Sequence, residues 1–589
     1  MEKTVYRTLE FPDYAMLVGY FVLMLLIGVY FYRHMREMKD YFCGGNAIPW
    51  WLSGVSFYMT SFSVAAFVFY PSVCYRHGWV GVTLLWVAVP AALFSALLFS
   101  KPWRRARIHS PVEYLETRYG AALRQVFAWQ GVPVKIIDDA IKLFATGKFI
   151  SICVGLDIKW SILGAGGIML IYTFMGGLWA VAVTDFIQFV VLSVGILVVL
   201  PLSINKAGGL TAIFENSPDG FFNLTGGDFG WSYVLPLVVL YSLAWSSINW
   251  SLIQKYYCVP KEKDARKVGL LVVALYVIGP PLMFFPAIAA HSFIPDLKDA
   301  GDVYPAVCSM LLPAGMLGLA IAAMFAATMS TLSGDYNVCA SVLTNDVYKR
   351  LIRPKASERE LVQIGRLMTL LVGVVALGAA FLMSRGKAED LFRIMVTLFG
   401  VATAPVAVPM LLGLVSRRAT SLSAMVGFIA GLSLGLALFF LSYFYKTGIW
   451  DIGFMQWKPA TEDVVFFGTT WKMEIFMFIS TTIVTYVTMI VISLIKPMTK
   501  EEEKRSDDFQ IRLATPIGQL PGDAVSGQTM MSPFRIVGIC TIVIGVMMLA
   551  LIPWLWGSPA YLWNVALGAV LIAIGLGLMF MSRGAKETA

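Results

Sequence analysis

Residues 321–349 read IAAMFAATMSTLSGDYNVCASVLTNDVYK, an apolar segment that becomes polar in its middle. On a helix, Ala327, Ser330, Thr331 and Asp335 share one face, because they are spaced i, i+3, i+4 and i+8. An acid and hydroxyls inside a membrane segment are costly unless they line a polar cavity or bind an ion. The alternative is a stripe of hydrogen bonds between neighbouring helices.

The composition is that of a polytopic membrane protein. Of the 589 residues, 58% are hydrophobic and 14% are charged, whereas a soluble domain carries about 25% charged residues. The net charge of +9 comes from short basic loops between apolar runs, which predicts a lipid bilayer and no nucleic acid as partner. Seven scattered cysteines and four histidines form no metal or catalytic motif, so the sequence indicates no enzyme.

Apolar runs long enough for one membrane crossing recur along the chain and predict about fifteen transmembrane helices. They lie near 13–33, 49–70, 79–100, 125–150, 158–175, 179–204, 232–254, 267–291, 304–345, 365–384, 391–415, 420–443, 473–495, 534–553 and 561–581. Basic residues concentrate in alternate connections, among them Arg36, Lys39, Arg104, Lys255, Lys261, Arg350, Arg417 and Lys504. This pattern places the amino terminus outside and the carboxyl terminus in the cytoplasm.

Two segments combine apolar length with unexpected polar groups. Residues 50–70 read WWLSGVSFYMTSFSVAAFVFY, and their hydroxyls favour a helix break that frees carbonyls for a cation. Close packing through small residues is the alternative. Residues 134–139 read VKIIDD. Here Lys135 and Asp139 are spaced for an intrahelical ion pair, which leaves Asp138 free to face a cavity.

Residues 241–257 read YSLAWSSINWSLIQKYY and place Asn249 between Trp245 and Trp250. Aromatic side chains beside hydrogen-bonding groups suit a small polar organic solute, although Trp is also common at membrane interfaces. Asp185 is a further acid within a predicted span. Several polar, interrupted helices in one bundle are typical of a transporter with a site at the middle of the membrane.

Residues 155–180 read GLDIKWSILGAGGIMLIYTFMGGLWA, with Tyr172, Thr173, Gly176, Gly177, Leu178 and Ala180 in a fixed pattern. This segment resembles the signature of the sodium/solute symporter family, which includes sodium/glucose and sialic acid transporters. The resemblance extends from about Asp13 to Pro497. It includes DYFCGGNAIPWW at 40–51, SPVEYLETRYG at 110–120, VTDFIQ at 183–188 and SVLTNDVYK at 341–349.

The resemblance implies an all-α polytopic membrane protein with an inverted five-plus-five helix repeat, the leucine-transporter-like fold, and additional terminal helices. The expected parts are an N-terminal extra helix in 1–48, a transport core in 49–415, two further helices in 416–496, a cytoplasmic linker in 497–533 and two C-terminal accessory helices in 534–589. It also implies sodium-driven import of a solute by alternating access across a plasma membrane, here the bacterial inner membrane. The sequence leaves the oligomeric state open, and a monomer is compatible with it.

By the same resemblance, the primary sodium site takes backbone carbonyls from Met59, Phe62 and Ala327 and hydroxyls from Ser330 and Thr331. Oxygen-only ligands suit a hard cation such as Na+. Some family members have a second sodium site, which corresponds here to Asp185, Ser330, Ser333 and Gly334. Gly334 stands where a serine is expected, and the adjacent Asp335 is a candidate to compensate, so coupling to one or to two sodium ions remains open.

The substrate site departs further from the family. In the sialic acid branch, an arginine and a glutamine correspond to Asp138 and Leu85 here. The exchange of arginine for an acid favours a sugar-like, polyhydroxy or amine-bearing solute. The candidate substrate residues are Ser61, Ser63, Asp138, Trp245, Asn249 and Trp250. The alternatives are a symporter of organic acids, either sialic acid-like or monocarboxylate, and a transporter-derived solute sensor.

Overall fold

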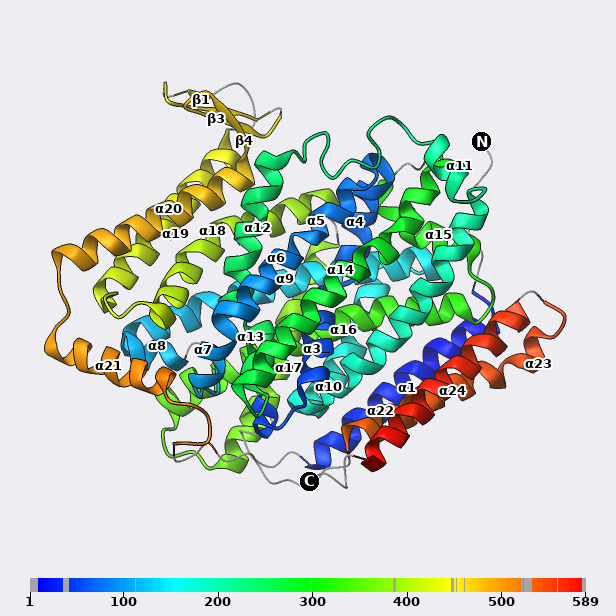
Figure 1. The fold of residues 1–589 in the computed structure, drawn as a ribbon, viewed down its shortest axis with the longest axis horizontal. Helices are drawn as coiled ribbons and strands as arrows, with labels where there is room; N and C mark the ends of the chain where they lie inside the picture. Colours follow the sequence, from blue (N-terminus) through cyan, green and yellow to red (C-terminus); the bar gives the residue numbers. More distant parts are fainter. Residues whose placement is uncertain are drawn as a thin grey trace.

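The chain folds as a bundle of helices with one small sheet (Figure 1). The computed structural model describes residues 9–34, 42–111, 113–295, 297, 299–384, 388–445, 450–451, 453–459, 461–520, 523, 532–558 and 560–584. Arg36 and Lys39 of the first basic loop lie outside these residues, as does the side chain of Tyr172 from the family pattern.

The helices of the first half are α1 (Phe11–His34), α3 (Trp50–Thr60), α4 (Val64–His77), α5 (Val80–Trp86), α6 (Ala88–Phe94), α7 (Ser100–Arg105), α8 (Glu113–Arg118), α9 (Ala121–Val154), α10 (Ile158–Lys206), α11 (Leu210–Glu215), α12 (Trp231–Ser246), α13 (Trp250–Tyr257) and α14 (Glu262–Phe293). Those of the second half are α15 (Val303–Leu311), α16 (Met316–Val342), α17 (Glu358–Met383), α18 (Ala388–Val415), α19 (Ser421–Phe444), α20 (Met473–Ile495), α21 (Lys500–Ala514), α22 (Pro533–Ala550), α23 (Ile552–Leu555) and α24 (Ala560–Gly584). The antiparallel sheet has the order β1 (Trp450–Asp451), β2 (Met455–Lys458), β3 (Asp463–Phe466) and β4 (Thr469–Lys472).

The described helices give fewer candidate membrane spans than the fifteen expected, and the exact number stays a prediction. Among the described residues, 11 helices are long and apolar enough to cross a membrane, or up to 14 if each of three bent pairs is one span. The runs near 158–175 and 179–204 join into the single helix α10 of 49 residues. The sheet occupies a connection where hydropathy predicted only a loop, because its strands are too short to register as spans.

Helix α16, which contains most of the opening stretch, is buried along its whole length and lies in the middle of the bundle (Figure 1). The buried Asp13 carboxylate of α1 fixes its beginning, because one oxygen accepts the backbone N–H groups of Gly315 at 2.8 Å and Gly318 at 2.9 Å. An acid at a helix N-terminus satisfies donors that have no partner within the helix. A Cβ at Gly318 would lie 2.1 Å from the carbonyl oxygen of Asp13, so glycine permits this contact.

Two membrane helices are broken near their middles, and both breaks face α16. Helices α3 and α4 meet at 62°, and α12 and α13 meet at 55°. At the first break, the Ser63 hydroxyl caps α4 by accepting the N–H of Ala65 at 3.3 Å, as expected of a serine at this position. At the second, the Trp103 indole donates to the carbonyl of Ser246 at 2.8 Å. The sequence correctly predicted the first break and missed the second.

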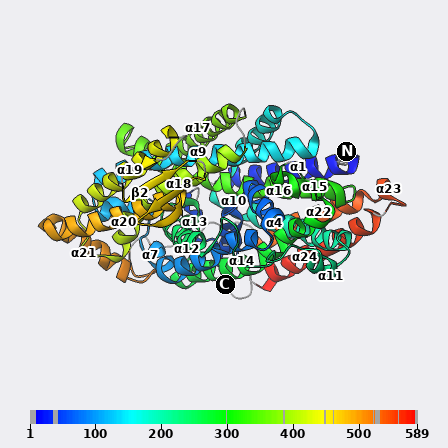
Figure 2. The same cartoon turned by 90° about the horizontal axis from the view of Figure 1, so that it is seen from above.

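The first helix and the last two long helices lie together at one end of the long axis (Figure 1). Helices α22 and α24 pack on each other and against α1 at one end, whereas α19, α20 and the sheet lie at the other (Figures 1 and 2). The core with the two broken helices lies between them. The accessory role expected for the last two helices stays a prediction.

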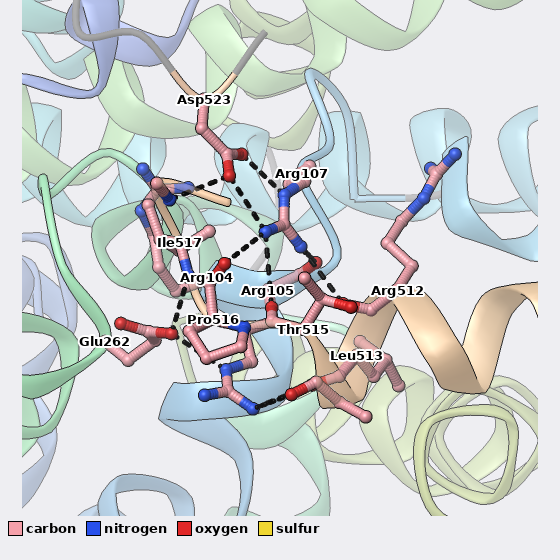
Figure 3. A network of polar contacts seen from close by, with 12 residues as sticks. Arg104, Arg105, Arg107, Glu262, Arg512, Leu513, Thr515, Pro516, Ile517 and Asp523 are labelled. Atoms are coloured by element: carbon pink, nitrogen blue, oxygen red, sulfur yellow. Dashed lines mark hydrogen bonds and ion pairs between the residues drawn. The ribbon is translucent and has the colours of Figure 1, made fainter. Parts of the chain in front are cut away.

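The expected linker 497–533 contains α21, which is tied to the core by an arginine network (Figure 3). We call residues 500–520 together with Asp523 the strap. The Arg107 guanidinium donates to Asp523 at 2.6 and 3.0 Å and to the carbonyls of Arg512 at 3.0 Å and Pro516 at 2.9 Å. Arg105 donates to the carbonyl of Ala514 at 2.8 Å. These contacts satisfy carbonyls at the C-terminal end of α21.

The Arg107 contacts carry a prediction for the strap. Arg107→Ala removes charge-assisted hydrogen bonds worth about 1.5–3 kcal/mol each at most, so we expect at least about tenfold faster hydrogen–deuterium exchange across residues 500–514. Arg512→Ala is the control, because that side chain is exposed. Unchanged protection in Arg107→Ala would show that other contacts hold the strap.

The same network predicts how the strap responds to pH. The Arg107 hydrogen bond and the N–H groups of Leu520 and Gly518 lower the pKa of Asp523. Because the folded pKa is lowered, this stabilisation is present above the ordinary aspartate value of about 3.9 and is lost only as pH falls through the lowered pKa.

Candidate functional site

A cavity of about 650 Å³ occupies the centre of the bundle and is lined from both broken helices, α9 and α16. This volume is within the range of about 300–1,000 Å³ typical of small-molecule sites. Its lining runs from Asp228 and Asp299, in two sparsely basic connections, to Thr331 and Asp335 on α16. The cavity therefore reaches from the face that the sequence assigns to the outside to the middle of the bundle.

Two of the predicted primary sodium residues, Phe62 and Thr331, line the inner end of this cavity. The Thr331 hydroxyl donates to the carbonyl of Phe62 at 2.7 Å and lies 3.2 Å from that of Ala327. The N–H of Val64 donates to the Thr328 hydroxyl at 3.0 Å, so α16 directly supports the break. Met59 is buried in the last turn of α3. The break thus brings carbonyl and hydroxyl oxygens together, which are the donors a hard cation prefers.

Ser330 lies between this pocket and Asp185. Its hydroxyl is 3.4 Å from that of Thr60, which in turn donates to Asp185 at 3.5 Å. The Ser56 hydroxyl also donates to Asp185. The Lys255 ammonium lies 3.9 Å from the same carboxylate, with both side chains at most 1% exposed.

Asp185 and Asp335, the two acids expected at a second sodium site, have different partners and lie in different pockets of side chains. Asp185 lies beside Ser330, whereas the Ser333 hydroxyl donates to the carbonyl of Ser330 at 3.0 Å. Asp335 lies on the other side, where it accepts hydrogen bonds from Ser251 at 2.7 Å and from Lys142 at 2.8 Å. The structure therefore does not bring Asp335 to Asp185. Close packing accounts for glycine at position 334, where the family has a serine. A Cβ there would lie 3.0 Å from Thr60 and 3.3 Å from Ser251.

The charged residues of α9 pair differently from the expected Lys135–Asp139 contact. The Lys135 ammonium lies 3.3 Å from Asp335 and 3.7 Å from Asp138. Asp138 and Asp139 instead contact Lys142 at 2.8 and 3.1 Å. The expectation was wrong because Asp335, which comes from α16, attracts Lys135 across the helix interface.

Most candidate substrate residues line the central cavity. Ser61, Ser63, Asp138, Trp245 and Asn249 are all in its wall. The Ser61 hydroxyl is already within 2.6 Å of the Tyr276 hydroxyl.

Trp250 is placed differently. It lies in a separate small cavity of about 30 Å³, which it shares with Lys135, Asp138 and Asn249. Its ring packs close to Gly131, where a Cβ would lie 2.1 Å from the indole. Trp250 therefore does not line the central cavity, but it lies beside three residues that do, Lys135, Asp138 and Asn249.

Sequence reasoning missed three residues of this region. Lys142 follows Asp138 and Asp139 at helical spacing, a signal that could have identified it. Lys255 was assigned to a basic loop, but α13 continues to Tyr257 and buries it. Ser251 gave no signal by itself, since only the fold shows that it faces Asp335.

At the mouth of the cavity, Lys148 pairs with Asp299 at 2.9 Å. Burial raises the pKa of Asp299, but the Lys148 hydrogen bond and the N–H of Gly301 outweigh burial and lower it overall. Burial raises the pKa of the neighbouring Asp302. The entrance of the cavity thus carries the ionised pair Lys148–Asp299, which a solute entering the cavity would pass.

Comparison with known proteins places these features in a family context. The model of the sodium:solute symporter family matches residues 41–220 and 264–431. The sodium/sialic acid symporter SiaT of Proteus mirabilis is 29% identical over 447 residues, which cover 72% of this chain and 89% of SiaT. The sodium/myo-inositol cotransporter 2 of Sus scrofa is 26% identical over 484 residues, which cover 74% of this chain and 71% of that protein.

A solved structure shows the same fold. A Na+-coupled sialic acid symporter in a substrate-bound outward-open state superposes with a TM-score of 0.70 at 23% identity, and the match covers 83% of this chain and 99% of that one. This similarity confirms the predicted all-α, leucine-transporter-like fold.

Proposed function

Because the chain belongs to the sodium:solute symporter family, we propose that it imports a small polyhydroxy or amine-bearing solute together with sodium bound between α3, α4 and α16. It is a multi-pass membrane transporter and not an enzyme. The observation that carries the proposal is the 2.7 Å contact of the Thr331 hydroxyl with the Phe62 carbonyl, at the inner end of a cavity of about 650 Å³.

The proposed sodium site couples the ion to a helix break. Phe62 lies at the junction of α3 and α4, whereas Ala327, Ser330 and Thr331 lie on the buried helix α16. A cation that draws these oxygens together adds binding energy only in conformations where the break lies against α16. Such differential affinity is what a ligand needs to shift a conformational equilibrium. Sodium would thereby favour the state in which the cavity reaches the outer face.

The proposed solute class follows from the cavity wall. Asp138 supplies a carboxylate, Asn249, Ser61 and Ser63 supply neutral hydrogen-bonding groups, and Trp245 supplies an aromatic surface. Such a combination of a few polar groups with aromatic walls is typical of sites for small polar molecules. Myo-inositol, a neutral polyol, appears in the name of one group of relatives, and a solute of that kind would use these hydroxyl and amide partners.

An organic acid is the second candidate, because Lys135 and Lys142 also line the cavity and two relatives are named as sialic acid symporters. Both ammonium groups are already paired with carboxylates. A carboxylate solute would therefore have to compete with Asp138 or Asp335 for them. A neutral polyol needs no such exchange, whereas an amine would have to share Asp138 with Lys142.

The proposal is tested by sodium-gradient uptake into proteoliposomes from a panel of polyols, amines and organic acids. For the best solute, Asp138→Asn is expected to change apparent affinity by roughly tenfold, about 1.4 kcal/mol, and to disfavour amines more than neutral polyols. Sodium affinity should stay unchanged. Asp219→Asn is the control, because Asp219 is exposed in a loop. An unaltered solute profile and affinity in Asp138→Asn would overturn the assignment of Asp138.

A further inference from the structure

Three carboxylates from two helices surround one ammonium beside the central cavity. Asp138 and Asp139 come from α9 and Asp335 comes from α16, and oxygens of all three lie within 4.8 Å of one another. This spacing would allow all three to contact one cation. The Lys142 ammonium lies among them, 2.8 Å from Asp138, 3.1 Å from Asp139 and 2.8 Å from Asp335.

The charge of this cluster requires a cation at that point. Three carboxylates confined to such a small, buried volume repel one another strongly, and one or more would take up a proton if no positive charge were near. Lys135 contacts Asp335 at 3.3 Å and Asp138 at 3.7 Å, and both distances are longer than those of Lys142 to the same two carboxylates. Lys142 is the ammonium that contacts each carboxylate.

One oxygen in the cluster is still unsatisfied. The second carboxylate oxygen of Asp139 is buried without a hydrogen-bond partner, and Asp139 is 0% exposed. Lysine offers only three N–H donors, and here they are directed at three different carboxylates. A cluster that leaves a buried carboxylate oxygen unpartnered retains affinity for positive charge.

We infer that Asp138, Asp139 and Asp335 form a cation site whose resident cation is the Lys142 ammonium, so that the chain fills by itself a place where a second ion would bind. This inference rests on the proposed sodium-coupled function and extends it to the coupling ratio. The tethered ammonium balances the carboxylates, so the cluster itself takes up no transported sodium and adds no ion to the one held in the pocket around Phe62 and Thr331.

The position of the cluster makes the inference testable with sodium itself. Asp138, Lys142 and Asp335 line the cavity of about 650 Å³, so an ion from solution can reach the carboxylates once the ammonium is removed. Methionine has an unbranched side chain of similar length to lysine and adapts to irregular spaces. Lys142→Met therefore removes the charge with little change of volume.

The experiment measures the number of ²²Na+ ions bound at equilibrium by the purified full-length chain without solute. Lys142→Met is expected to bind one more sodium ion per chain than the unchanged protein, and Lys142→Arg the same number. Lys148→Met is the matched control on α9, because its partner Asp299 is in a loop and half-exposed. It should gain no ion. An equal number of ions in Lys142→Met and the unchanged protein would overturn the inference.

If Lys142→Met is unstable, its thermal unfolding is measured in sodium and in choline. A Lys142→Met protein that is folded in sodium but unfolded in choline supports the inference, because the added ion then replaces the ammonium. A protein that is unfolded in both salts contradicts it. A failure of the proposed function gives a different result. The unchanged protein would then bind no sodium, whereas Lys142→Met could still bind one sodium ion more than the unchanged protein.

Discussion

Replacement of both hydroxyls of the sodium pocket, in Ser330→Ala/Thr331→Ala, is expected to abolish sodium-driven uptake at ordinary sodium concentrations. Thr331 contacts the Phe62 and Ala327 carbonyls, and Ser330 lies one residue away on the same buried helix. Hydrogen bonds to charged groups are worth about 1.5–3 kcal/mol, and we expect the contact of a hydroxyl oxygen with Na+ to be of the same order. Loss of two such ligands should therefore weaken apparent sodium affinity at least about 100-fold.

The measurement is initial uptake rate as a function of sodium concentration in proteoliposomes. Thr369→Ala is the control, because this buried hydroxyl donates to a carbonyl of its own helix at 2.9 Å. Its loss removes a buried hydroxyl without touching the pocket. Sodium affinity that stays within twofold of the unchanged protein in the double variant would show that sodium binds elsewhere.

Removal of the Asp335 carboxylate, in Asp335→Ala, is expected to cause the largest loss of stability. Asp335 is 1% exposed and accepts from Lys142, Lys135 and Ser251. Deletion of one partner of a buried ion pair typically costs about 3–5 kcal/mol, and here Lys135 loses its nearest carboxylate while Ser251 loses its acceptor. The variant should melt at a clearly lower temperature and transport no solute.

A double-mutant cycle separates the ionic contribution from lost packing. In Asp335→Asn/Lys142→Met, one negative and one positive charge are removed together, so the net charge of the cluster is unchanged. We expect this pair to be less destabilised than the sum of its single substitutions, by about 0.5–3 kcal/mol as is usual for contacting residues. Additive losses of stability would mean that Lys142 and Asp335 are not coupled.

Much of the fold could be predicted from the sequence because hydropathy and hydroxyl content act locally. The apolar runs marked most of the membrane helices, and the serines and threonines of 50–70 predicted the break between α3 and α4. The break between α12 and α13 was missed. At that break the Trp103 indole donates to the carbonyl of Ser246 from 143 residues away in the sequence, a contact that no local pattern indicates.

The candidate site was predictable where its residues share one helix face, as Ala327, Ser330 and Thr331 do. It was not predictable where partners come from different helices, because the rotation of each helix decides which side chains meet. Lys135 was expected beside Asp139 but contacts Asp335, which is 200 residues away in the sequence. Lys255 shows a second limit, since hydropathy alone does not distinguish a basic loop from the buried end of α13.

The central claim is that sodium binds where the break between α3 and α4 meets α16, and the most direct measurement is an electron cryo-microscopy structure of the full chain in sodium and in choline. The claim predicts density for one ion between the carbonyls of Phe62 and Ala327 and the hydroxyls of Ser330 and Thr331, present in sodium and absent in choline. Sodium-dependent density only beside Asp185, or none near Phe62 in either salt while sodium still drives uptake, would contradict it.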